Sequence, residues 1–159
     1  MMYRLFAMDV DGTLTDGSIY VGGDTEYKRF DIKDGMGLTL FRKAGGKIAV
    51  ISGRYSPATE RRARELHFDY VANGCADKLS ALKDFARQAA VRPEEVAYAG
   101  DDINDVECVR WAGLGIAVAD AVPQLIDAAD YVTERRGGNG AIREAADMLL
   151  SMNAAEGEQ

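Results

Sequence analysis

The sequence contains few of the residue types on which several common enzyme sites depend. Of its 159 residues, one is histidine, two are cysteine and three are proline. A single histidine, His67, excludes a histidine-based triad or a multi-histidine metal site unless another subunit contributes. Cys75 and Cys108 lack the spacing of a thiolate metal site. They are expected to be small buried or half-buried side chains in a protein of the reducing cytoplasm.

The sequence also lacks a long hydrophobic run and an excess of positive charge. We expect neither a signal peptide nor a membrane-spanning helix, which needs roughly 20 consecutive apolar residues. The net charge of −7 argues against nucleic acid or an anionic membrane as the main partner. With 47% hydrophobic and 28% charged residues, the composition is typical of a soluble globular protein. These features predict one domain over residues 1–150 and a frayed tail over residues 151–159.

Apolar strand-like segments alternate along the chain with segments of helical periodicity. Strands are expected at residues 5–10, 47–51, 69–71, 96–99, 114–118 and 131–132, and helices at residues 38–43, 57–66, 78–90, 106–112 and 141–150, with a helical turn after residue 123. This alternation predicts an α/β fold, a three-layer Rossmann-like parallel sheet with helices on both faces. Two β-prone runs around Gly22-Gly23-Asp24 predict a projecting hairpin at about residues 18–30. Nothing in the chain is long enough to form a cap domain.

Two acidic residues end the first expected strand. Asp9 and Asp11 are one residue apart, and Gly12 follows them. Ligands bind at the carboxyl ends of the strands in open parallel sheets. Two carboxylates there can bind a magnesium ion, and one of them can attack phosphorus. Since Asp-Gly is also a common turn dipeptide, this segment alone leaves an acidic turn as the alternative.

Polar residues of complementary types follow the other expected strands. Ser52 ends the second strand, Lys78 begins the helix after the third, and Asp101 and Asp102 follow the fourth. A carboxylate nucleophile needs an acid for the leaving oxygen, a hydroxyl for phosphate oxygens and an ammonium to balance charge. The strand ends therefore predict a site for phosphoryl transfer that depends on Mg²⁺.

The order and spacing of these motifs resemble the haloacid dehalogenase superfamily of phosphatases. The motifs are Asp9-x-Asp11-Gly12-Thr13, Ser52-Gly53-Arg54, Lys78 and Gly100-Asp101-Asp102-x-x-Asp105. Four ordered motifs on expected strand ends are far more specific than any one of them. The resemblance implies that Asp9 is the nucleophile and forms an aspartyl-phosphate. It implies that Asp11 is the general acid and then the base for water.

The same resemblance implies the residues that bind phosphate and metal. Ser52 and Lys78 would bind phosphate. Magnesium would be bound by Asp9, by Asp11 through its backbone carbonyl, and by Asp101, with Asp102 close behind.

Further segments are similar to the capless 3-deoxy-D-manno-octulosonate (KDO) 8-phosphate phosphatases. They are residues 14–17, the hairpin, residues 30–37 and residues 137–144, so the similarity covers nearly the whole chain. It implies hydrolysis of KDO 8-phosphate to KDO and inorganic phosphate. It also implies a homotetramer in which hairpins pack together and a neighbouring subunit helps to close the site.

The resemblance implies a substrate-binding set as well, namely Lys33, Asp34, Gly35, Gly53, Arg54, Arg62 and Asn104. Arg54 matches the octulosonate type better than the nonulosonate type, which tends to have an acid there. Thr39 and Asn139 depart from the subfamily, which usually has a basic residue at the first position and often arginine at the second. A phosphatase for a nonulosonate 9-phosphate, from KDN or sialic acid, therefore stays open as an alternative.

Two other classes of function are alternatives to a phosphatase. One is a non-catalytic tetramerisation module, as occurs fused to nucleotide-sugar synthetases. The pair Asp9 and Asp11, with Lys78 and Asp101, argues against a dead site. The other is a receiver-like phosphoacceptor domain, which does not need an acid two residues after its nucleophile, whereas this chain has Asp11.

Overall fold

The computed structural model describes residues 1–157. Six parallel strands form one sheet in the order β5-β4-β1-β6-β7-β8. They are β1 (Leu5–Met8), β4 (Lys47–Ser52), β5 (Tyr70–Asn73), β6 (Val96–Gly100), β7 (Leu114–Ala117) and β8 (Tyr131–Val132). The chain extends the sheet from β1 to one side and then returns to extend it on the other. The predicted α/β fold is confirmed, and its reversal point lies beside β1.

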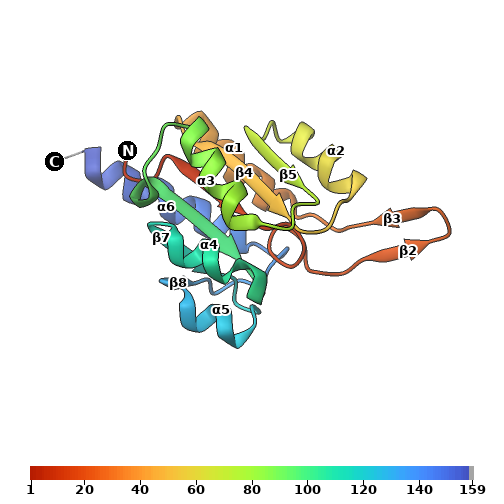
Figure 1. The fold of residues 1–159 in the computed structure, drawn as a ribbon. Coiled ribbons are helices and arrows are strands. Elements are labelled where there is room, and N and C mark those ends of the chain that lie inside the picture. The colour runs from red at the N-terminus through yellow and green to blue at the C-terminus, as the bar shows by residue number, and fades with distance from the viewer. Residues whose placement is uncertain (158–159) are drawn as a thin grey trace.

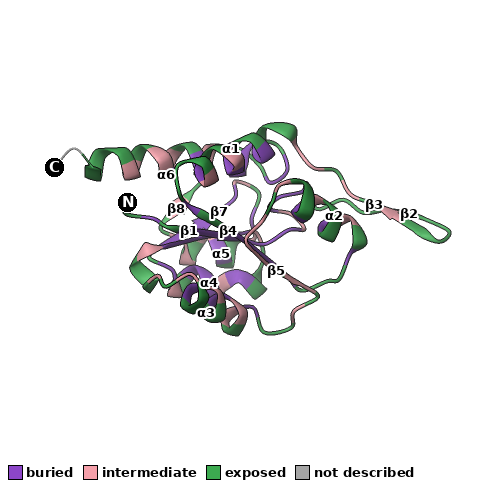
Figure 2. Ribbon diagram, turned by 90° about the horizontal axis from the view of Figure 1, so that it is seen from above, coloured by how far each residue is buried: buried purple, intermediate pink, exposed green. Residues whose placement is uncertain are grey.

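Helices cover both faces of this sheet (Figure 2). On one face lie α1 (Ile32–Lys43), α2 (Pro57–Glu65) and α6 (Ala141–Gly157); on the other lie α3 (Lys78–Gln88), α4 (Val106–Trp111) and α5 (Pro123–Ala128). Side chains along β1 alternate between the two cores, since Phe6 and Met8 pack in the first and Leu5 and Ala7 in the second. Both faces are apolar because both are covered.

Helix α1 begins earlier than expected. The side chain of Asp31 accepts hydrogen bonds from the backbone N–H groups of Lys33 and Asp34, at 2.7 and 3.4 Å, and so caps a helix that already includes the glycine-rich segment. Glycine is favoured at position 37 because α6 lies close to it. A Cβ on Gly37 would be only 3.1 Å from the Cβ of Ala146. Residues 32–37, which were expected to precede the helix, are therefore part of a helix–helix contact.

Helix α6 continues through Gly157, where a frayed tail was expected from residue 151. Asn153 explains the difference, because its side chain pairs with the backbone of Tyr3 at the other end of the chain. The Tyr3 N–H donates to Asn153 Oδ1 at 2.7 Å, and Asn153 Nδ2 donates to the Tyr3 carbonyl at 2.9 Å. The last part of the expected tail, residues 158–159, lies outside the described residues.

The predicted hairpin projects from the body of the molecule (Figure 1). Its strands, β2 (Tyr20–Gly22) and β3 (Thr25–Tyr27), are antiparallel and form a separate two-stranded sheet. Tyr20, Val21 and Tyr27 are 56, 79 and 63% exposed. Across residues 1–157, no helix is both long enough and apolar enough to span a membrane.

Asp34 is fully buried between α1 and α6. Its Oδ1 accepts a hydrogen bond from the backbone N–H of Arg143, at 2.8 Å, in the first turn of α6, while its Oδ2 has no partner. Burial raises the pKa of the Asp34 carboxyl from its ordinary 3.8 to about 6. Asp34 thus joins two helices, and because the residue is 0% exposed, its carboxyl is closed to the expected ligand in this conformation.

We expect Asp34→Asn to change how stability depends on pH. Because the folded-state pKa of Asp34 is raised, its ionisation destabilises the fold progressively as pH rises from about 4 to above 6. The amide does not ionise but still accepts the Arg143 N–H. Relative to wild type, the variant should therefore gain up to about 3 kcal/mol between pH 4 and pH 7. Urea unfolding of both proteins between pH 4 and pH 7 measures this difference in the free energy of unfolding. If the stability of the two proteins changed in parallel with pH, the prediction would be wrong.

Candidate active site

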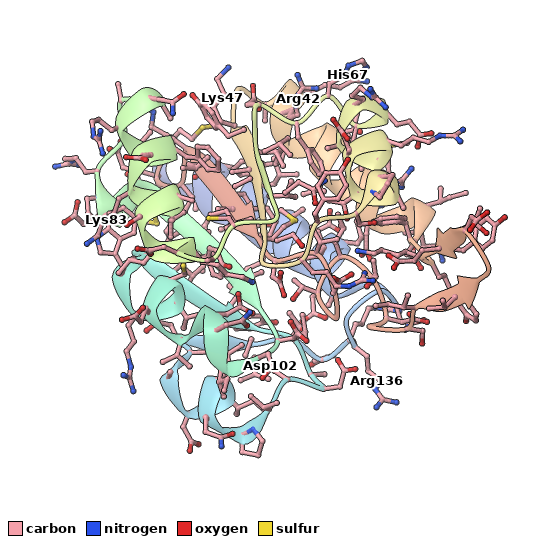
Figure 3. All side chains as sticks on the ribbon, turned by 45° about the vertical axis from the view of Figure 1, so that its right-hand side comes forward. Arg42, Lys47, His67, Lys83, Asp102 and Arg136 are labelled. Carbon is pink, nitrogen blue, oxygen red and sulfur yellow. The ribbon has the colours of Figure 1, made fainter. Side chains whose placement is uncertain are left out.

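Polar side chains meet where β1, β4 and β6 end. Because these strands are adjacent and parallel, Asp9 lies between Ser52 and Asp101. They line a pocket of about 330 Å³ whose walls are Asp9, Asp11, Ser52, Gly53, Arg54, Asp101, Asp102 and Asn104. Figure 3 shows Asp102 and Arg136 at this edge, far from Lys47 at the start of β4. The strand ends converge as predicted.

Lys78, the first residue of α3, connects two of the strand ends. Its Nζ lies 2.8 Å from Asp9 Oδ1 and 2.9 Å from Asp105 Oδ1. Burial alone would lower the pKa of this ammonium, but the charges of Asp9 and Asp105 outweigh it and raise the pKa above 10.5. Lys78 is therefore a permanently charged group beside Asp9, suited to balancing an anionic phosphoryl group.

Asp105 is a site residue whose role the sequence did not reveal. Besides Lys78, its Oδ1 accepts the hydroxyl of Tyr98 at 2.7 Å, and its Oδ2 accepts the backbone N–H groups of Asp101 and Asp102, at 3.1 and 3.3 Å. The side chain thereby fixes the turn after β6 and the position of Lys78. The spacing Gly100-Asp101-Asp102-x-x-Asp105 was visible in the sequence, but these partners come only from the fold.

Asp101 faces Asp9 across the pocket. The Thr13 hydroxyl donates to Asp101 Oδ1 at 3.2 Å. Burial, together with the hydrogen bond and charge of Asp9, raises the pKa of Asp101 to about 9. Burial also raises the pKa of Asp9, as does the charge of Asp105, although Lys78 opposes the shift. Two neighbouring carboxyl groups with raised pKa values indicate that a cation would stabilise this site.

The loop after β1 is held by backbone contacts that leave no space for side chains. The carbonyl of Val10 accepts the N–H groups of Thr13, Leu14 and Thr15 at 2.9–3.2 Å. Gly138, with φ +68°, donates its N–H to the Thr13 carbonyl at 3.1 Å. A Cβ on the neighbouring Gly137 would be 1.9 Å from the carbonyl oxygen of Gly12. The two glycines are therefore required for this loop to pack as it does.

Asp11 has a second lysine as its partner. Lys28, just after β3, places its Nζ 2.7 Å from Asp11 Oδ1. The same Nζ donates to the hydroxyl of Thr59 in α2, at 3.3 Å. Nothing in the sequence singled out Lys28, because alternation along a hairpin does not show which side chains turn back to the domain.

Arg54 lies at the mouth of the same pocket. Its backbone carbonyl accepts the Ser52 hydroxyl at 2.9 Å. Its guanidinium forms a two-point ion pair with Glu26 of β3, in which Nη1 lies 2.7 Å from Oε1. The hairpin therefore holds one expected substrate residue as well as Asp11.

Four other residues expected to bind substrate lie outside the walls of this pocket, namely Lys33, Asp34, Gly35 and Arg62. Arg62 stacks over Phe30, with its guanidinium carbon 5.6 Å from the ring centre, and covers Gly35. Lys33 lines a different pocket, of about 640 Å³, with Arg135, Asn139 and Arg143 among its walls. Lys33, Asp34 and Gly35 lie in the first turns of α1, and Arg62 lies in α2, so within one subunit none of them lines the pocket at Asp9.

The carboxylates are suitable ligands for a hard divalent cation. Oxygen atoms from Asp9, Asp101 and Asp105 lie within 4.8 Å of one another. Asp105 already has a partner on each oxygen, so Asp9 and Asp101 are the side chains with capacity to bind metal. Oxygen ligands of this kind fit Mg²⁺.

We expect Mg²⁺ to stabilise the protein and Asp101→Asn to abolish that effect. At 100 times its dissociation constant, the ion would add about 2.7 kcal/mol, which corresponds to roughly 5–10 °C in Tm. Without metal, the variant should melt above wild type, since it no longer has to bury or protonate a second acid beside Asp9. Differential scanning fluorimetry with Mg²⁺ and with chelator measures both. The exposed Asp84→Asn in α3 is the control, and a wild-type Mg²⁺ shift in Asp101→Asn would refute the assignment.

Comparison with known proteins identifies the chain as similar to phosphatases, in agreement with the geometry of the site. Residues 70–144 match the family model of the haloacid dehalogenase-like hydrolases. The chain is 43% identical over 148 residues to the 3-deoxy-D-manno-octulosonate 8-phosphate phosphatase of Escherichia coli K12, covering 92% of this chain and 79% of that protein.

Solved structures of phosphatases are also similar to this protein. The phosphatase of the same name from Moraxella catarrhalis, in complex with magnesium, phosphate and KDO, superposes with a TM-score of 0.92 at 41% identity, covering 94% of this chain and 87% of that one. The cobalt-bound enzyme from Haemophilus influenzae gives 0.92 at 38% identity, with 94% and 84% covered. The chain therefore belongs to the KDO 8-phosphate phosphatase family of haloacid dehalogenase-like hydrolases.

Proposed function

We propose that this protein is a Mg²⁺-dependent phosphomonoesterase that hydrolyses KDO 8-phosphate to KDO and inorganic phosphate. The observation that carries the proposal is Asp9, buried against Lys78, with Asp11, Ser52 and Asp101 around one pocket. The names of its relatives support the same substrate. Arg54 in that pocket, rather than an acid, favours the octulosonate over a nonulosonate.

The reaction has two steps. In the first, a carboxylate oxygen of Asp9 attacks phosphorus, the bond from phosphorus to the C8 oxygen breaks, and Asp11 donates its proton to that oxygen. This gives KDO and an aspartyl-phosphate. In the second, Asp11 takes a proton from water, the water oxygen attacks phosphorus and the bond to Asp9 breaks, releasing phosphate.

The other groups bind and orient the phosphate. The Ser52 hydroxyl and the Lys78 ammonium would bind its oxygens, with Lys78 held in place by Asp105 and Tyr98. When bound, Mg²⁺ would be held by the carboxylates of Asp9 and Asp101 and the backbone carbonyl of Asp11, with Asp102 nearby, and would offset negative charge on nucleophile and phosphate. Gly53, Arg54 and Asn104 are the proposed contacts for the sugar acid.

We also infer that the protein is a homotetramer assembled through its hairpins. A two-stranded hairpin is marginal alone, and this one exposes Tyr20, Val21 and Tyr27. Packing against copies of itself would bury those side chains and would bring a neighbouring subunit toward the open pocket. The free thiols of Cys75 and Cys108 fit a reducing compartment, and we place the enzyme in the cytoplasm.

Asp9→Asn should abolish phosphate release while leaving the fold intact, because the amide keeps the shape of the side chain but is a poor nucleophile. Asp11→Asn should lower kcat by about 10²–10⁴-fold, the range for general acid–base catalysis. Inorganic phosphate release from a panel of sugar-acid phosphates, with and without chelator, measures activity and substrate together. Circular dichroism checks the fold, and Asp84→Asn is the control. A folded, active Asp9→Asn protein would exclude the covalent route.

Val21→Asp should dissociate the assembly, because it adds a charge to a side chain that is 79% exposed in one subunit and buried in the proposed tetramer. Light scattering should give a tetramer for wild type and a smaller species for the variant. Val71→Asp makes the same change at an exposed position in β5 and should remain tetrameric. A fully active wild-type monomer at micromolar concentration would refute the assembly.

A further inference from the structure

The two carboxylates that follow β1 each have a buried lysine as partner. Asp9 is paired with Lys78, which comes from α3. Asp11 is paired with Lys28, which comes from the segment after β3. The first lysine belongs to the phosphate site described above, whereas the second has no place in that mechanism.

The Lys28 side chain is fully buried, although it follows a strand of the projecting hairpin. Its exposed fraction is 0%, and that of its partner Asp11 is 27%. Burial of an ammonium is unfavourable unless it is paired. Here the paired group is the side chain that exchanges protons with the substrate. A lysine used only to attach the hairpin would not need to reach that carboxylate.

The contacts of Lys28 restrict how Asp11 can move. The Nζ group lies 2.7 Å from Asp11 Oδ1 and donates to Thr59 Oγ1 at 3.3 Å. Thr59 is itself buried, at 2% exposed, and belongs to α2, which packs on the sheet. The ammonium is thus held on one side by a fixed hydroxyl and holds one oxygen of Asp11 on the other. Of the two carboxylate oxygens of Asp11, Oδ2 is therefore the one that Lys28 leaves available to the pocket.

A second contact ties the same part of the hairpin to the pocket. Glu26 of β3 pairs with Arg54, a residue of the pocket wall. Two side chains, two positions apart, therefore reach back from the hairpin to the site. The base of the hairpin is therefore held in position by Asp11 and Arg54 of the site, independently of what the tip of the hairpin contacts.

We propose that Lys28 is a positioning residue that orients Asp11 for proton transfer to the leaving oxygen. The inference rests on the proposed role of Asp11 as general acid. Lys28 does not exchange protons in this scheme. It holds Oδ1, so that Oδ2 points its proton at the oxygen that leaves phosphorus.

The test uses leaving groups that differ in their need for a proton. The C8 alkoxide of KDO needs one, whereas p-nitrophenolate departs without it. Lys28→Met keeps the length of the side chain and removes its charge. For KDO 8-phosphate we expect kcat/KM to fall about 10- to 100-fold, part of the range for a general acid. For p-nitrophenyl phosphate it should change less than about 3-fold. Lys83→Met, on α3 and away from Asp102 in Figure 3, is the control and should match wild type with both substrates.

A double-mutant cycle separates this inference from the role of Asp11. In an Asp11→Ala background, Lys28→Met should have little further effect, because the group through which it acts is gone. If Asp11→Ala itself does not lower kcat/KM for KDO 8-phosphate, the proposed mechanism fails. If Asp11→Ala does lower it, but Lys28→Met lowers activity equally on both substrates or retains its effect without Asp11, the positioning role fails.

A second variant covers the case in which Lys28→Met does not fold or assemble, as judged by circular dichroism and light scattering. Thr59→Val removes the hydroxyl that holds Lys28 and keeps the volume of the side chain. It should show the same dependence on leaving group, with a smaller loss for KDO 8-phosphate. Equal losses for the two substrates in Thr59→Val would overturn the proposal.

Discussion

A single ammonium group holds together the carboxyl edge of the sheet. Lys78 bridges Asp9, which follows β1, and Asp105, which follows the turn after β6. The bridge places two carboxylates and an ammonium within a few ångströms of one another, with their side chains at most 8% exposed. Such burial is unfavourable unless every charge is paired. The tyrosine hydroxyl and the two backbone N–H groups on Asp105 complete that pairing. The position of Asp101, and so the proposed metal site, follows from the same turn.

The parts of the site that were predictable are those determined by strand order. Asp9, Ser52 and Asp101 end neighbouring parallel strands, and parallel strands bring their carboxyl ends together wherever they pair. Buried apolar runs identify such strands in a sequence, so the convergence of these residues could be expected before any coordinates were known. Tyr131 and Val132, in the shortest strand of the sheet, were expected for a different reason, because they complete the alternation of strands and helices.

The parts that were missed depend on contacts between distant segments. Lys28 and Thr59 are 31 positions apart, and neither carries a local pattern that indicates the other. Asp34 lies in a polar, glycine-rich segment that is typical of a loop, yet Gly37 in that segment allows α6 to pack closely on α1, and Gly35 leaves room for Arg62 of α2. The segment that resembled a substrate loop is thus a tightly packed helix start. Periodicity identifies elements, but it does not show which polar side chains those elements bury.

The contact of Gly137 and Gly138 with the loop at Gly12 and Thr13 has a consequence for synthesis on the ribosome. The loop that carries the nucleophile leaves the ribosome more than a hundred residues before the backbone that supports it. Lys78 and Asp101 emerge in between. A growing chain can therefore form β1 and its hairpin early, but it cannot complete the site until the turn before α6 has left the exit tunnel. Activity should thus appear only when nearly the whole domain has been made.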